Sequence, residues 1–186
     1  IAKQSGKIIF IGQKSRFASE NLGWIQYDKT IETVDGVEFR SFSGLKYKPP
    51  KEVAQKYFTS GKHCWNLGYF VTTPKNLISK FDEFAPEISS HLKIIQNSFG
   101  SKNYTEILDK EYAKIPEINF DNAILERLTD KDAYVVVEDI GWSDVGAWEA
   151  LKEALEKSKS DTVTLGKVKL ENSNDSLVYN YEPEKL

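Results

Sequence analysis

The 186-residue sequence contains no methionine and a single cysteine, Cys64. One cysteine excludes a disulfide within the chain and a zinc site built from several thiolates, and it favours a reducing compartment. The absence of methionine, even at position 1, indicates a fragment cut from a longer chain. No apolar run approaches the roughly 20 residues that cross a bilayer, and the first residues lack the zones of a signal peptide. We therefore expect a cytoplasmic protein with no membrane partner.

Clusters of basic residues are also missing. The 25 Lys and Arg residues are scattered among 28 Asp and Glu residues, which gives a net charge of -3. This pattern provides no electrostatic footprint for a polyanion, so nucleic acid is excluded as a partner. Neither common type of phosphate-binding glycine loop is present. The oligomeric state stays open, with a homodimer as one alternative.

The hydrophobic content of 40% is enough to bury the core of one domain with a small appendage. Runs of strand length alternate with amphipathic segments, which predicts an α/β fold whose site lies at the carboxyl ends of strands. The tail at 162–181 alternates apolar and polar residues and predicts a separate all-β unit, so we place the domains at 1–158 and 159–186. Strands are expected at 7–12, 23–27, 37–45, 65–72 and 133–138, and helices at 51–60, 74–99 with a break near Pro86, 104–112, 120–128 and 147–157.

The motif GWSDVGAW at 141–148 follows the most continuously apolar strand. Asp144 lies between two glycines, and one carboxylate together with substrate phosphates is a typical arrangement for Mg²⁺. The alternative is that Asp144 only caps the next helix, which on its own is the more common role of such an aspartate. Gly146 favours close approach of the backbone to a ligand, whereas Trp148 is expected in the core.

Two further polar residues stand near the ends of predicted elements. Lys48 precedes the helix at 51–60, where a lone lysine is usually a solvated charge. Asn66 lies between Trp65 and Gly68, so its amide could meet the vicinal hydroxyls of a sugar, although a turn asparagine more often binds its own backbone.

Other residues carry weaker signals. Gly23 in ENLGWI either lets a ligand approach the backbone or relieves a bulge. Asp121 falls in the first turn of the helix expected at 120–128, and Glu126 is expected on its solvated face. His63 and Cys64 are adjacent and cannot face each other as base and nucleophile, and His91 lies within an amphipathic helix.

Taken in order, these motifs resemble those of the mannose-1-phosphate guanylyltransferases. The matching stretches are LGWI at 22–25, LKYKP at 45–49, SGKHCWNLGYF at 60–70, INFDNAILE at 118–126 and GWSDVGAW at 141–148. The resemblance implies the carboxyl-terminal portion of a Rossmann-like, GT-A-like nucleotidyltransferase domain with a mixed sheet, followed by the start of a β-helical unit. The family's glycine-rich triphosphate signature and a further metal-binding aspartate are expected upstream of these residues.

The resemblance also implies roles for individual residues. Asp144 is expected to hold Mg²⁺ and Lys48 to meet the phosphate of the sugar phosphate, which makes these two the catalytic candidates. Two departures from the family pattern stand out: Tyr47 replaces a glutamate expected to touch sugar hydroxyls, and Glu20-Asn21 replaces Thr-Gly. The predicted substrate contacts are Asn66, Gly23, Trp65, Gly146 and Asp121.

The implied reaction joins GTP and mannose 1-phosphate into GDP-mannose and pyrophosphate. GTP and mannose 1-phosphate would then be its small-molecule partners, and the fragment alone is expected to be inactive. Two alternatives stay open. One is a related enzyme with another sugar or base, and the other is a binding homologue that has kept the fold without the chemistry.

Overall fold

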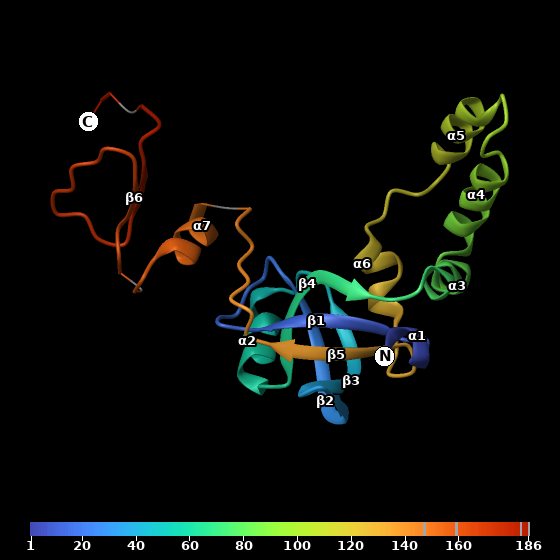
Figure 1. Ribbon diagram of the computed structural model, residues 1–186, viewed down its shortest axis with the longest axis horizontal. Helices are drawn as coiled ribbons and strands as arrows, with labels where there is room; N and C mark the ends of the chain where they lie inside the picture. Colours follow the sequence, from blue (N-terminus) through green and yellow to red (C-terminus); the bar gives the residue numbers. More distant parts are fainter. Residues whose placement is uncertain (147, 159, 183, 186) are drawn as a thin grey trace. The chain divides into compact units, whose positions relative to one another are not determined.

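The computed structural model describes residues 1–146, 148–158, 160–182 and 184–185, which form two compact units, Ile1–Asp139 and Ile140–Leu186. The domain boundary expected between residues 158 and 159 stays a prediction. The first unit contains α1 (Ala2–Ser5), β1 (Ile8–Lys14), β2 (Gly23–Val34), β3 (Val37–Lys46), α2 (Lys51–Ser60), β4 (His63–Val71), α3 (Pro74–Phe84), α4 (Pro86–Asn97), α5 (Tyr104–Tyr112), α6 (Phe120–Ala123), the short 3-10 helix η1 (Leu125–Arg127) and β5 (Ala133–Glu138) (Figure 1).

Five strands build the first unit and pair in the order β1-β4-β2-β3-β5. Strand β5 also pairs in parallel with β1, from Ile8 opposite Ala133 to Gln13 opposite Glu138, so the ring of strands closes. All other pairings are antiparallel. The predicted α/β class with a mixed sheet is confirmed.

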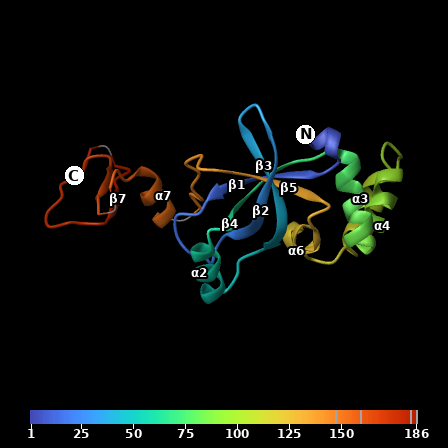
Figure 2. The same ribbon diagram turned by 90° about the horizontal axis from the view of Figure 1, so that it is seen from below.

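The hairpin between β2 and β3 forms where the sequence predicts it. Asp35 and Gly36 both adopt positive φ, at 51° and 82°. Two such residues in succession give the tight turn whose twist matches that of the flanking strands. The far end of this hairpin extends past the other strands (Figure 2).

Helix α2 begins and ends at the predicted signals. Pro50 precedes its first residue, and Gly61 ends it in the left-handed conformation with φ 65°. The helical segment after β4 is likewise divided at Pro86, because proline provides no N–H for the preceding turn. Thr73 caps α3 by accepting a hydrogen bond from the Asn76 N–H.

The prediction of one continuous helix at 120–128 is wrong, because α6 ends at Ala123 and the short helix η1 follows. Ile124 leaves the helical conformation with φ -126° and ψ -57°. Ala123, Ile124 and Leu125 are all buried in the same core. Three consecutive residues of a regular helix spread over more than half of its circumference, and the break at Ile124 coincides with the burial of all three in one core.

The core of the first unit lies on two faces of the strands. One cluster combines the ring of strands with α6 and η1, and it includes Phe10, Ile25, Phe42 and Cys64. The other places Trp24 and Trp65 against Ala54 of α2. Cys64 is fully buried, and burial raises the pKa of its thiol to about 12.

The second unit contains α7 (Trp148–Leu155), β6 (Val163–Leu165) and β7 (Leu177–Tyr179). The expected helix at 147–157 is thus present, although Ala147 lies outside the described residues. Strands β6 and β7 pair in parallel, which confirms β structure in the tail. No helix in the described part of the chain is long and apolar enough to span a membrane.

Candidate functional site

Asn66 lies on β4 between two glycines on the neighbouring strands. In the strand register it is opposite Gly12 of β1 and Gly23 of β2. A Cβ atom on Gly23 would lie 3.1 Å from the Asn66 Cβ and 3.4 Å from its Nδ2. Because glycine has no side chain, Gly23 lets β2 pack closely against Asn66, and both residues are buried.

The side chain of Asn66 makes two hydrogen bonds. Its Oδ1 accepts from the Gly68 N–H at 3.1 Å, which is the ordinary turn contact. Its Nδ2 donates to Asp121 Oδ1 at 3.0 Å. The structure therefore brings together three of the predicted substrate contacts, Gly23, Asn66 and Asp121, on one face of the strands.

Asp121 is a partly buried carboxylate in the first turn of α6. Burial raises the pKa of this carboxyl above its usual value, and the negative charge of Glu126 acts in the same direction. The hydrogen bonds from its own backbone and from Asn66 oppose these effects without cancelling them. A carboxylate in this environment gains from any further hydrogen-bond donor.

Glu126 does not lie on a solvated face, so that expectation is wrong. Its Oε1 accepts from the Tyr47 N–H at 2.8 Å and pairs with Lys46 Nζ at 3.1 Å, and its side chain is 20% exposed. Burial alone would raise the pKa of this carboxyl, but the hydrogen bond from Tyr47 and the Lys46 ammonium group hold it below the usual value. Sequence reasoning missed this contact because Tyr47 and Glu126 are 79 residues apart in the chain.

Lys48 follows the end of β3 and is exposed. Its φ of 42° is in the left-handed region, although the next residue is a proline that favours extended backbone before it. Such a conformation costs on the order of 1 kcal/mol and occurs often at binding sites. The Lys48 Nζ lies 5.2 Å from the centre of the Tyr47 ring.

Trp65 points to the opposite face from Asn66 and is 1% exposed. Its ring packs against Trp24 at 6.4 Å between centroids and against Phe17 at 4.7 Å, and the Arg16 guanidinium lies 5.2 Å from it. The indole Nε1 finds no acceptor among the described residues. Trp65 thus packs in the core on the face of β4 opposite to Asn66. Its predicted contact with a substrate stays a prediction.

Asp144 and Gly146 belong to the second unit, and both are exposed. A Cβ atom on Gly146 would make an ordinary contact, 3.6 Å from Asp144 Oδ1. Trp148 is 62% exposed, so its expected place in the core is wrong. The described residues contain no group of three or more His, Cys, Asp or Glu suited to a metal. An exposed single carboxylate still fits Mg²⁺, which commonly binds one or two carboxylates and fills its other positions with phosphate oxygens and water.

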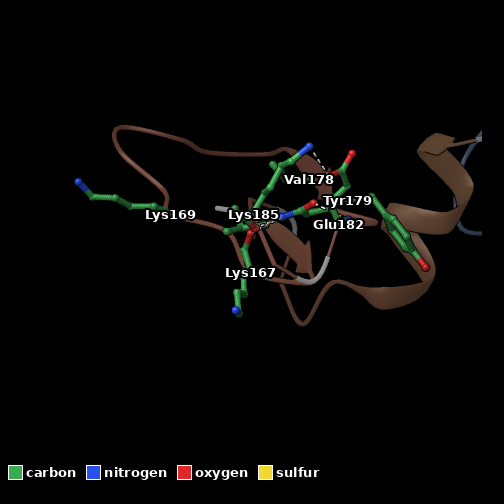
Figure 3. A pocket seen from close by; sticks show the side chains of 8 residues that line it. Lys167, Lys169, Val178, Tyr179, Glu182 and Lys185 are labelled. Atoms are coloured by element: carbon green, nitrogen blue, oxygen red, sulfur yellow. Dashed lines mark hydrogen bonds and ion pairs between the residues drawn. The ribbon is translucent and has the colours of Figure 1, made fainter.

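A separate cavity, of about 560 Å³, is lined by Lys167, Lys169 and Lys185 of the tail. Figure 3 shows that these side chains point in different directions. Lys169 pairs with Glu171 at 2.7 Å and Lys185 pairs with Glu182 at 2.6 Å. The ammonium groups therefore do not converge on one anion.

The model of the nucleotidyl transferase family matches residues 1–161. Because the match covers most of the chain, this protein belongs to the nucleotidyl transferase family.

The resemblance of the sequence motifs to mannose-1-phosphate guanylyltransferases is confirmed by individual relatives. The chain is 29% identical over 183 residues to mannose-1-phosphate guanylyltransferase 2 of Escherichia coli O157:H7, with 96% of this chain and 37% of that protein covered. It is 26% identical over 182 residues to mannose-1-phosphate guanylyltransferase of Sinorhizobium fredii, with 97% and 34% covered. The chain thus spans little more than a third of the length of these relatives.

A solved structure shows the same fold. The crystal structure described as mannose-1-phosphate geranyltransferase from Thermus thermophilus matches with a TM-score of 0.77 at 23% identity. The match covers 96% of this chain and 50% of that chain. The similarity supports the arrangement of strands and helices given above.

Proposed function

We propose that the whole protein forms GDP-mannose and pyrophosphate from GTP and mannose 1-phosphate. The family supports nucleotidyl transfer, and the names of the relatives supply the sugar and the base. The observation that carries the proposal is the fixed Asn66 amide, set between two glycines and bound to Asp121. Amide and carboxylate groups are suited to hydrogen bonds with sugar hydroxyls.

The reaction requires one bond to form and one to break. A phosphate oxygen of mannose 1-phosphate attacks the α-phosphorus of GTP, and the bond from that phosphorus to the bridging oxygen of the β-phosphate breaks and releases pyrophosphate. Positioning and charge neutralisation dominate catalysis of such transfers. Lys48 would meet the sugar phosphate, and Asn66 with the Gly23 backbone would hold the sugar. Asp144 would hold Mg²⁺, which supplies positive charge for the phosphate oxygens when bound.

The same proposal covers the type of domain formed by the strands and the structure of the tail. We infer that the ring of strands is the sugar side of a GT-A-like domain whose triphosphate signature lies in the portion of the relatives that this chain does not span. The parallel pairing of β6 and β7 fits successive turns of a β-helix, because a β-helix stacks its strands in parallel.

Tyr47 favours a second candidate, a nucleotidyltransferase for another sugar phosphate. The resemblance expects a glutamate at this position, and the Tyr47 backbone instead binds Glu126. Supplying the full-length protein with a panel of sugar 1-phosphates and nucleoside triphosphates separates the candidates by the nucleotide sugar formed. A protein that binds these compounds and releases no pyrophosphate would be the non-catalytic homologue.

The metal assignment has its own test in the full-length protein. Asp144→Asn should lower turnover by orders of magnitude without changing thermal stability, because the neutral amide is a much poorer ligand for Mg²⁺. Release of pyrophosphate at saturating Mg²⁺ measures the effect. Asp130→Asn, at an exposed aspartate of the first unit, is the matched control and should keep the parental rate. Near-parental turnover of Asp144→Asn would refute the role of Asp144.

A further inference from the structure

An apolar groove lies at the base of the helical hairpin formed by α4 and α5, which pack side by side (Figure 1). It consists of two adjoining cavities of about 400 and 420 Å³ between the start of α4 and the segment that follows α5. The residues that line both cavities are Ile88, Pro116, Glu117, Ile118 and Ala123. A contiguous apolar surface of this kind marks an interaction site rather than ordinary solvated surface.

The turn at the other end of the same helical hairpin carries an apolar knob, Phe99. This residue is 79% exposed, the largest fraction among the large hydrophobic residues that the structure describes. Its ring contacts Tyr104 edge-on, with 5.5 Å between the ring centroids. Because a second aromatic ring supports it, Phe99 can fill a pocket on a partner with little loss of side-chain freedom.

The knob and the groove lie on the same side of α4. Ser98 keeps helical backbone angles after the last residue of α4, so the helical path continues to the start of the turn. Along such a path the step from Ile88 to Phe99 rises by about 16 Å with a net rotation of only about 20°. One face of the helical hairpin thus presents both a knob and a groove.

The charges at the two ends of the helical hairpin are complementary. Lys102 is exposed in the turn that carries the knob, whereas Glu87 and Glu117 are exposed beside the groove. None of these three residues takes part in an ion pair within the described part of the chain. The other charged residue at the groove, Arg127, donates a hydrogen bond to the Phe84 carbonyl oxygen, and the two acids leave the groove acidic overall.

We propose that a second copy of this chain binds this face, with the Phe99 ring of each copy in the groove of the other. A two-fold axis across the middle of α4 makes both contacts at once, since such symmetry brings the same patch of the two copies together. Each chain offers one knob and one groove, so the pairing closes as a dimer and fills both. Lys102 of each copy then lies beside Glu87 and Glu117 of the other. No residue of the candidate sugar site lines the groove, so this inference does not depend on the proposed function.

Disulfide cross-linking of the full-length protein tests this arrangement directly. Lys102→Cys and Glu117→Cys together should give a covalent dimer under mild oxidation, whereas either change alone and the parent should not. Within one chain the length of α5, about 13 Å, separates the two positions, and a disulfide spans at most about 7 Å between Cα atoms. Cys64 is buried and does not compete.

Sedimentation of the full-length protein measures the strength of the same contact. Phe99→Ala should raise the dimer dissociation constant by about 10- to 100-fold, the usual effect of removing a buried aromatic side chain from an interface. Ile31→Ala, at an exposed apolar residue of β2, is the matched control and should leave the constant unchanged. Slow reaction of Cys64 with a thiol reagent verifies that each variant is folded.

A charge reversal separates direct contact from a change in the fold. Lys102→Glu should weaken the dimer by about 10-fold, because it places a third acid beside the two at the groove. Adding Glu117→Lys to the same chain should restore part of the loss, since the pair forms again with opposite signs. Lys56→Glu, at an exposed lysine of α2, is the control and should match the parent.

Each contrary outcome overturns the proposal. A parent protein that stays monomeric at the concentrations used for cross-linking would show that no second copy binds the groove. A dimer that gives no cross-link through these cysteines and resists Phe99→Ala would have its interface elsewhere. A reversed pair that restores nothing would show that Lys102 and Glu117 do not meet across the two copies.

Discussion

Glu126 shows how one side chain can join separate parts of the chain. It connects η1 to the end of β3 through the Tyr47 N–H and the Lys46 ammonium group. Its side chain is largely covered, so the bond to the Tyr47 N–H is shielded in part from water. Removing its charge should therefore affect stability more than removing the charge of an exposed glutamate.

We predict that Glu126→Gln lowers the free energy of unfolding at neutral pH by about 1 kcal/mol. The folded-state pKa lies below the ordinary value, so the carboxylate stabilises the fold above that value, and this stabilisation is lost as pH falls through the folded pKa. Urea unfolding of parent and variant should thus converge at acidic pH. Glu106→Gln, at an exposed residue of α5, should match the parent throughout, and a Glu126→Gln deficit that persists in acid would contradict the assignment.

Packing between β1 and β4 leaves no space at Gly12. A Cβ atom there would lie 2.3 Å from the Cys64 Sγ and 3.3 Å from its Cβ. Gly12→Ala should destabilise the fold by about 1–3 kcal/mol, as expected for an overfilled core. Adding Cys64→Ala should restore part of the loss, because the shorter side chain removes the closest contact. Thermal unfolding of the two single variants and the double variant measures the coupling, and additive effects would show that the strands shift apart instead.

Local signals predicted most of the elements. Asp35-Gly36 predicted the hairpin and Pro86 the division between α3 and α4, because each restricts the backbone at one point of the chain. The break at Ile124 was not predicted by such local signals. The residues around it are buried in a core that forms only in the folded chain. The pairing of Asn66 with Asp121 spans 55 residues and depends on that core. Both residues could be singled out from the sequence, but their contact could not.

The whole molecule consists of two units with unequal cores. Both buried clusters lie within residues 1–139. We predict that a chain of residues 1–139 folds alone and keeps Cys64 protected, because every neighbour that buries this thiol is retained. Reaction with a thiol reagent should be slow in buffer and rapid in denaturant for both the short and the complete chain. Rapid reaction of the short chain in buffer would show that the second unit contributes to the first core.

The long hairpin has a consequence for behaviour at high concentration. Past Tyr27, β2 pairs only with β3 among the described residues, which leaves a two-stranded ribbon with exposed Ile31, Val34 and Val37. Unpaired strand edges with apolar side chains invite edge-to-edge polymerisation of identical chains. Charged residues such as Glu32 and Glu38 alternate with them and act as gatekeepers. Resistance to aggregation therefore depends on side chains that take no part in the chemistry.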